Sequence, residues 1–227
     1  MPKNDYWKLS AYESAKLIKD GSISAEDLVS SCIERVNQTN NKINAIVDNL
    51  SEPALEKAHE LDKLTKKGKF KGPLHGVPIT IKENIDQKGY ATPNGLEALK
   101  NLIAPGNAPV VDNLEKDGAI VIGRTNTPEF SMRGTTDNVI HGRTYNPWND
   151  WASPGGSSGG ASAAVMSGMG SLAHGNDIAG SLRIPSTATG ACTVKPGLGR
   201  VPAFNPSQTQ ERGLVAQLMS VQGIIAV

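Results

Sequence analysis

The chain has 227 residues, of which 38% are hydrophobic and 4% aromatic, so it is long enough to bury a core as one large domain or two small ones. Its 23 basic residues balance 22 acidic ones, which gives no electrostatic support for binding nucleic acid or an anionic membrane. No apolar segment reaches the roughly 20 residues that span a bilayer and the first residues lack the apolar core of a signal peptide, so a cytoplasmic protein is expected.

Helical patterns dominate the first 70 residues. The segment 10–13 has the form of a capping box and predicts a helix to about Asp20, which Gly21 would terminate. A second helix is predicted from Ser24, because apolar residues follow it at helical spacing. These residues are Leu28, Val29, Cys32, Ile33 and Val36.

Two further elements are predicted before residue 70. A short strand is expected at residues 43–47. Pro53 suits the first turn of a third, charged helix that runs to about Lys66, with Leu55, Ala58 and Leu61 toward the core. The sequence therefore predicts a mostly helical segment without catalytic groups.

From Gly72 the pattern changes to short β-branched runs and glycine-rich turns. Residues 77–82 form a strand candidate, and its alternation places Val77, Ile79 and Ile81 on one face and Thr80 with Lys82 on the other. A helical segment around 110–116 leads into a buried-strand pattern at 119–123. Strands that alternate with helices indicate a layered α/β domain.

Two serine-containing segments, 153–160 and 177–185, carry the chemistry of the sequence. The first is rich in glycine and feeds the small-residue run 161–167, which suits a tightly packed helix. The amides and the positive dipole end of that helix would point at the loop and favour negative charge there. Serines presented among exposed amides are suited to acyl transfer.

The glycine-rich loop allows three simple interpretations. A flexible turn would be the default for an isolated octapeptide of this composition. A phosphate-binding loop is disfavoured, because the Gly-Lys-Ser/Thr ending is absent. Gly-x-Ser-x-Gly, the nucleophile elbow of α/β-hydrolases, matches around Ser157 and Ser158, but residues 145–151 form no buried strand before it, and only His174 follows, with no intervening acid.

Activation of a serine without histidine requires another base. Lys82, at the end of the predicted apolar strand, is the best candidate, although a lysine is more often a solvated surface group. Burial disfavours the charged form of lysine and would let Lys82 act as a neutral general base near neutral pH.

Taken together, the segments around Lys82, Ser157 and Ser181 resemble a known family, the amidase signature enzymes. The similarity extends from about residue 7 to 223 and is densest in 76–84, 153–160 and 175–185, with a continuation through 195–201. The 24-residue step from Ser157 to Ser181 also equals the spacing of the two catalytic serines in that family. The family hydrolyses amides with a Ser-cisSer-Lys triad.

The resemblance assigns a role to each triad residue. It implies that Ser181 is the nucleophile, that Ser157, after a cis peptide bond, is the bridging serine, and that Lys82 is the ultimate base. Neutral Lys82 would take the proton of Ser157 while Ser157 takes that of Ser181, and the reverse transfer would protonate the leaving amine.

The resemblance also implies supporting roles around the nucleophile. The oxyanion hole would consist of the backbone amides of Ile178, Ala179, Gly180 and Ser181. Asp177 and Arg183 would brace the nucleophile loop, whereas Ser158 is expected to cap the helix that follows it rather than to donate from the loop. Met132 and Thr136 are expected to face the acyl pocket.

For the fold, the resemblance implies an α/β architecture with a central mixed sheet flanked by helices, incomplete at the C-terminus. Residues 1–70 would be a helical segment that packs on the core, 71–227 the amidase signature core, and the two together one domain. A small-molecule amide would be the substrate, with no cofactor, no metal and no nucleic-acid or membrane partner; a homodimer is left open.

Departures from the family pattern, together with the chain length, bear on the choice between three possible functions. Asn176 stands where threonine is commoner, and Ala179 where glycine is usual. Ile184 and the segment 195–202 differ from the A subunit of glutamyl-tRNA amidotransferase, so a stand-alone amidase is favoured and the amidotransferase component is the first alternative. Because family members are roughly twice as long, a truncated inactive amidase-like protein is the second, and the apolar end 224–227 is expected to leave strand edges exposed.

Overall fold

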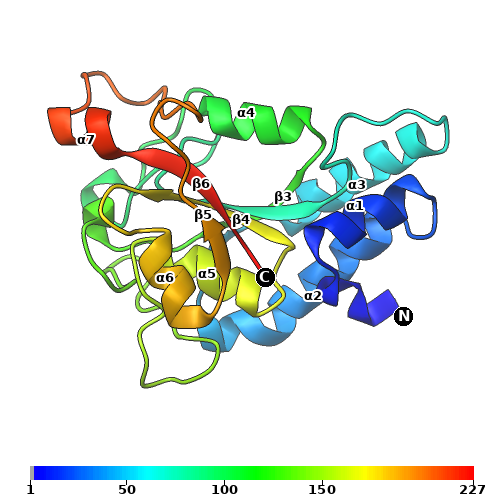
Figure 1. The fold of residues 1–227 in the computed structure, drawn as a ribbon, viewed down its shortest axis with the longest axis horizontal. Helices are drawn as coiled ribbons and strands as arrows, with labels where there is room; N and C mark the ends of the chain where they lie inside the picture. Colours follow the sequence, from blue (N-terminus) through cyan, green and yellow to red (C-terminus); the bar gives the residue numbers. More distant parts are fainter. Residues whose placement is uncertain (1–2) are drawn as a thin grey trace.

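A single mixed sheet forms the centre of the molecule (Figure 1), in a computed structural model that describes residues 3–227. Its strands lie in the order β1-β3-β2-β4-β6-β5. The strands β3, β2 and β4 are parallel, whereas β1, β6 and β5 run antiparallel to the strands beside them. The strands are β1 Ile46–Asn49, β2 Pro78–Lys82, β3 Ile120–Thr125, β4 Leu172–Asp177, β5 Cys192–Val194 and β6 Val221–Ala226. This arrangement confirms the predicted fold class.

Helices lie on both faces of this sheet. Figure 1 shows α4 on one side and α2, α5 and α6 on the other. The α-helices are α1 Ala11–Lys19, α2 Ala25–Ile43, α3 Ser51–Thr65, α4 Pro109–Lys116, α5 Gly159–Met166, α6 Arg183–Thr189 and α7 Leu214–Met219; the 3-10 helices are η1 Lys3–Lys8, η2 Glu97–Leu99 and η3 Glu129–Ser131. None of the described helices is long and apolar enough to cross a membrane.

The two faces of the sheet bury separate apolar clusters. On one face, Ile120 and Ile122 pack with the apolar sides of α2, α3 and α5. On the other face, Ile79 and Ile81 pack with Val111 of α4 and its neighbours. Since successive side chains of a strand point to opposite faces, Lys82 lies on the α5 side of the sheet. The predicted alternation of this strand is therefore confirmed.

The N-terminal helices follow the predicted signals closely. Ser10 and Glu13 form the predicted capping box at the start of α1, and Gly21 has φ of 72° just after that helix. The first helices share one apolar cluster with the sheet and α5. The expected strand at 43–47 is wrong in its first half, because α2 continues to Ile43 and ends on Asn44 in a left-handed conformation.

The C-terminal segment lies within the sheet. Val221 and Ile225 are buried, and β6 pairs with β4 on one side and with β5 on the other. In the apolar end 224–227, Ile225 is buried and β6 is paired on both sides, so the expectation that this end leaves strand edges exposed is wrong for β6, whereas Val227 is 71% exposed. Val221 and Ile225 are four positions apart in β6 and therefore lie on the same face of the strand.

Candidate active site

Lys82 is the last residue of a strand that is buried along its whole length. Its side chain is fully buried, and Nζ lies 2.7 Å from Ser157 Oγ, 3.1 Å from Ser158 Oγ and 2.8 Å from Asn176 Oδ1. Burial lowers the pKa of Lys82 from 10.5 to about 7, although the nearby carboxylates of Glu83 and Asp177 favour the charged form. A large fraction of Lys82 is therefore neutral near pH 7.

The glycine-rich loop brings Ser157 to this amine. Gly155 has φ of 79°, and a side-chain carbon there would lie 2.5 Å from Pro185 Cα; one on Gly156 would lie 2.5 Å from a main-chain oxygen of the loop 133–135. Glycine is therefore required at both positions. The Gly156–Ser157 peptide is cis, as the resemblance implied, and Ser157 is buried.

Asp177, at the end of β4, organises the loop that carries Ser181. Its carboxylate accepts hydrogen bonds from the Gly180 amide (2.8 Å), the Leu182 amide (3.1 Å) and the Arg183 guanidinium (2.9 and 3.0 Å). Burial alone would raise the pKa of Asp177, but the Arg183 side chain and the two amides outweigh it and lower that pKa to about 2. The predicted bracing contact is thus present.

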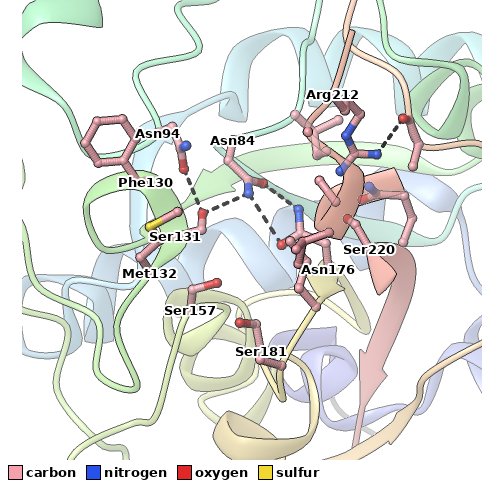
Figure 2. A pocket seen from close by; sticks show the side chains of 18 of the residues that line it. Asn84, Asn94, Phe130, Ser131, Met132, Ser157, Asn176, Ser181, Arg212 and Ser220 are labelled. Atoms are coloured by element: carbon pink, nitrogen blue, oxygen red, sulfur yellow. Dashed lines mark hydrogen bonds between the residues drawn. The ribbon is translucent and has the colours of Figure 1, made fainter. Parts of the chain in front are cut away.

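Ser157 and Ser181 line the same cavity, which has a volume of about 780 Å³. The Ser158 amide donates to the Ser181 carbonyl at 3.1 Å, so the two serine segments are directly joined. Figure 2 shows both hydroxyls facing the pocket. Met132 lies on the rim and is 83% exposed. The structure therefore brings Ser157 into contact with Lys82 and places Ser157, Ser181 and Met132 around one cavity.

Three sequence-based assignments need correction. The Gly180 amide is engaged by Asp177, which leaves Ile178, Ala179 and Ser181 as the pocket-lining candidates for the oxyanion hole. Ser158 makes no side-chain cap, because its hydroxyl contacts Lys82 instead.

Thr136 is the third correction. Its side chain is fully buried, accepts a hydrogen bond from the Gly159 amide (3.1 Å) and donates to the Gly155 carbonyl (3.0 Å). Thr136 therefore holds the glycine-rich loop from behind and does not line the cavity.

A buried polar cluster that sequence reasoning missed lies behind Lys82. The Glu83 carboxylate is buried and lies 2.9 Å from His141 Nε2. Arg124, fully buried on β3, donates to the carbonyls of Glu83 (2.9 Å) and Ile85 (3.0 Å). These bonds fix the chain just after β2 and so the position of Lys82. The charged residue next to Lys82 was the only sequence signal for the cluster.

A polar network beside the triad was also missed. It consists of Asn84, Asn94, Ser131 and Asn176, all of which line the cavity (Figure 2). Asn84 belongs to the Lys-Glu-Asn segment of the resemblance, and Asn176 stood out as a departure from the family. The sequence carried no signal for Ser131, because its role depends on how a turn folds back on the site.

Comparisons with known proteins agree on one family. The family model described as Amidase matches residues 27–226. An indoleacetamide hydrolase from Bradyrhizobium diazoefficiens is 54% identical over 225 residues, which are 99% of this chain and 43% of that protein. The A subunit of the glutamyl-tRNA(Gln) amidotransferase from Natranaerobius thermophilus is 37% identical over 217 residues, which are 96% of this chain and 43% of that protein.

The solved structures agree with the sequence relatives. A fatty acid amide hydrolase matches with a TM-score of 0.91 and 31% identity, over 100% of this chain and 40% of that chain. The chain thus spans less than half the length of the relatives it matches.

Proposed function

This chain belongs to the amidase signature family, and we propose that the protein carrying it hydrolyses a carboxamide to a carboxylate and ammonia or an amine. The observation that carries the proposal is the contact between fully buried Lys82 and Ser157, because a lysine with a pKa near 7 can act as a base at neutral pH. The identity to an indoleacetamide hydrolase makes an aryl-substituted acetamide the first substrate to test.

In the proposed mechanism, Ser181 attacks the amide carbon. Ser157 takes the proton of Ser181 and passes its own proton to Lys82, and the reverse path delivers a proton to the leaving nitrogen. The Ile178, Ala179 and Ser181 amides stabilise the tetrahedral oxyanion, where one donor is worth about 2.7–4 kcal/mol. Water then hydrolyses the acyl-enzyme by the same relay. Asp177, paired with Arg183, keeps the nucleophile loop in shape.

We extend the proposal to the organisation of the protein. Residues 1–70 and 71–227 act as one domain, supported by the apolar cluster that α2 and α3 share with β3 and α5. The protein works in the cytoplasm on a small molecule and has no nucleic-acid partner, in line with a net charge of +1. A homodimer is compatible with this assignment.

The test is ammonia release by the purified native protein from aliphatic, aryl and indole-3-acetamides, together with stoichiometric labelling by a fluorophosphonate. We expect hydrolysis and labelling in the wild type and neither in Ser181→Ala. Glutamine-dependent transamidation with partner subunits, without hydrolysis of simple amides, would favour the amidotransferase component instead. A native protein of 23.9 kDa that neither hydrolyses amides nor labels would support the truncated, inactive alternative.

A further inference from the structure

The four polar residues beside the triad form a hydrogen-bond chain with a defined direction (Figure 2). Ser131 Oγ donates to Asn94 Oδ1 at 2.7 Å, and Asn84 Nδ2 donates to Ser131 Oγ at 2.9 Å. Asn176 Nδ2 donates to Asn84 Oδ1 at 3.0 Å, and Asn84 Nδ2 lies 3.4 Å from Asn176 Oδ1, so the two amides pair. As a result, Asn176 presents its oxygen to Lys82.

This direction matters because a neutral amine has two N–H donors and one lone pair. Asn176 Oδ1 can only accept, and it accepts from Lys82. Ser158 Oγ donates to the Asn176 carbonyl at 3.3 Å, so that hydroxyl also accepts from Lys82. Both N–H groups of neutral Lys82 are then used. The lone pair is left for Ser157, the residue whose proton Lys82 must take.

We propose that Asn84 and Ser131 are positioning residues that hold the Asn176 amide in one orientation and thereby direct the lone pair of neutral Lys82 toward Ser157. The inference rests on the proposed function, since only a lysine that acts as a base needs its lone pair directed. Asn84 and Ser131 act through Asn176 and take no proton themselves.

The turn that presents Ser131 has an unusual backbone conformation. Phe130 and Ser131 have φ of 54° and 57°, a left-handed conformation that costs non-glycine residues about 1–3 kcal/mol each. Such a turn persists only where its surroundings hold it. The Ser131 hydroxyl is held by Asn84, Asn94 and Thr127, the last at 3.0 Å. The Asn176 amide can therefore reverse only if Asn84 reverses too, against these contacts.

The cluster also reaches the bridging serine. Thr127 Oγ1 contacts Ser131 Oγ and donates to the Ser157 carbonyl at 3.1 Å. One polar cluster therefore orients the acceptor beside Lys82 and fixes the main chain of Ser157.

Several charged and titratable groups lie around Lys82 and can influence its pKa. Glu83 follows Lys82 directly and contacts His141. The flanking strand β3 contributes Arg124, and β4 contributes His174 and Asp177, the latter paired with Arg183. The helix α5 contributes no titratable residue. A substitution at Asn84 leaves all of these groups in place.

The experiment is titration of Lys82 by nuclear magnetic resonance in lysine-labelled protein, with assignment by Lys82→Met. In Asn84→Ala the Asn176 amide is free to turn its NH₂ toward Lys82, which disfavours the ammonium, so the pKa of Lys82 falls. Asn84→Asp still accepts from Asn176 Nδ2 and adds a negative charge, so that pKa rises. The fall in Asn84→Ala is the signature of the proposed role, because general loosening of the site would let water reach the ammonium and raise the pKa of Lys82 in both variants.

A second measurement reports on the relay itself. In Asn84→Ala the lone pair of Lys82 no longer points at Ser157, so Lys82 cannot readily take the proton of Ser157. The rate constant for fluorophosphonate labelling of Ser181 therefore falls about tenfold at saturating pH. Asn40→Ala is the matched control, since the Asn40 side chain is also held by several hydrogen bonds, here to the backbone of Ala45 and Ile46, away from the site. It should lower thermal stability and leave the pKa of Lys82 unchanged.

An unchanged Lys82 pKa in Asn84→Ala overturns the inference. If that variant does not fold, Ser131→Ala is used, which removes the acceptor of Asn84 Nδ2 and should lower the pKa in the same direction by less; no change there overturns it equally. The titration needs no turnover. Absence of amide hydrolysis in the wild type would therefore reject the proposed function alone, and the Lys82 titration would still decide the orientation of Asn176.

Discussion

The floor and the rim of the cavity are built in opposite ways. By floor we mean Ser157, which lines the cavity, together with Lys82 and Asp177, which lie buried behind the cavity wall; each is at most 1% exposed, and every one has several hydrogen-bond partners. On the rim, Met132 and Leu214 are 83% and 69% exposed and offer only apolar surface. The other large apolar residues of the rim are Phe130, Ile178, Ile184, Phe204 and Val215.

We infer from this difference that the floor carries out the reaction and that the rim selects the substrate. Burial and hydrogen bonds hold the floor in one geometry, which the proposed proton relay needs, because misplacement by about 1 Å can cost 10²-fold in rate. The rim gains its binding energy from apolar area that each substrate covers, so its residues can be exchanged at low cost. We expect substitutions on the floor to change kcat and those on the rim to change KM.

Lys82→Met provides the largest expected effect. Turnover should fall by about 10⁴-fold, because the base is lost while the length of the side chain is kept. Stability at pH 7 should rise by a few kcal/mol, because a buried group that must be partly deprotonated is replaced by an apolar one. Ammonia release and chemical denaturation at pH 7 measure the two effects.

The pH dependence of that stability gain tests its cause. The folded-state pKa of Lys82, about 7, lies below the ordinary 10.5, so between these values the unfolded chain binds the extra proton. Wild-type stability should therefore rise with pH across this interval, and the advantage of Lys82→Met should shrink. A gain that is constant from pH 7 to 10.5 would contradict burial as its origin.

The pH–rate profile gives the second prediction. Only neutral Lys82 can accept the proton, so kcat/KM should fall about tenfold per pH unit below 7 and level off above it, and at pH 5 should be about 100-fold lower than on the plateau. Glu83→Gln removes a charge that favours the ammonium and should move the midpoint to lower pH. A limb that continues rising toward pH 10.5 would mean that Lys82 titrates as a solvated lysine.

The sequence predicted the floor better than the polar network beside it, for a physical reason. Lys82 ends a strand whose apolar residues predict burial. Gly155 and Gly156 lie where the main chain of another segment comes too close for a side chain. A local sequence pattern therefore indicated each of these features. The amide acceptors Asn84 and Asn176 meet only because β2 and β4 are adjacent in the sheet. No local pattern carries that pairing.

The fold shows the same limit. The helix α1 was predicted almost to the residue from its cap and its terminating glycine, and α2 was predicted at its start and along its apolar stripe but not at its end. The strand β6 and the helix α7 were not predicted, because β6 owes its position to pairing with two distant strands and the six residues of α7 include no buried one. Tertiary contacts, rather than intrinsic propensity, decide such short elements.

Asp177→Asn tests the contact between Asp177 and the loop that carries the nucleophile Ser181. The asparagine keeps the shape but replaces one acceptor by an NH₂ group that faces donors, so kcat should fall about 10- to 100-fold with little change in KM. Arg183→Met should reduce kcat by less than about threefold, since that side chain is 54% exposed and water can replace it. Equal losses in both variants would place the brace in the ion pair rather than in the bonds to the Gly180 and Leu182 amides.

Leu214→Ala should give the smallest effect, confined to substrates that reach the rim. Leu214→Ala removes three carbons, of which a substrate lying on the open rim covers about one; a covered methylene is worth about 0.8 kcal/mol, so KM for a bulky aryl amide should rise about fourfold while kcat stays constant. A small amide such as acetamide cannot extend from Ser181 to the rim and should be unaffected. Trp151→Ala is the control: Trp151 is 94% exposed but lies off the cavity, so neither KM should change. If Leu214→Ala instead lowered kcat for acetamide, the rim would be mechanically coupled to the relay, and the separation of floor from rim would fail.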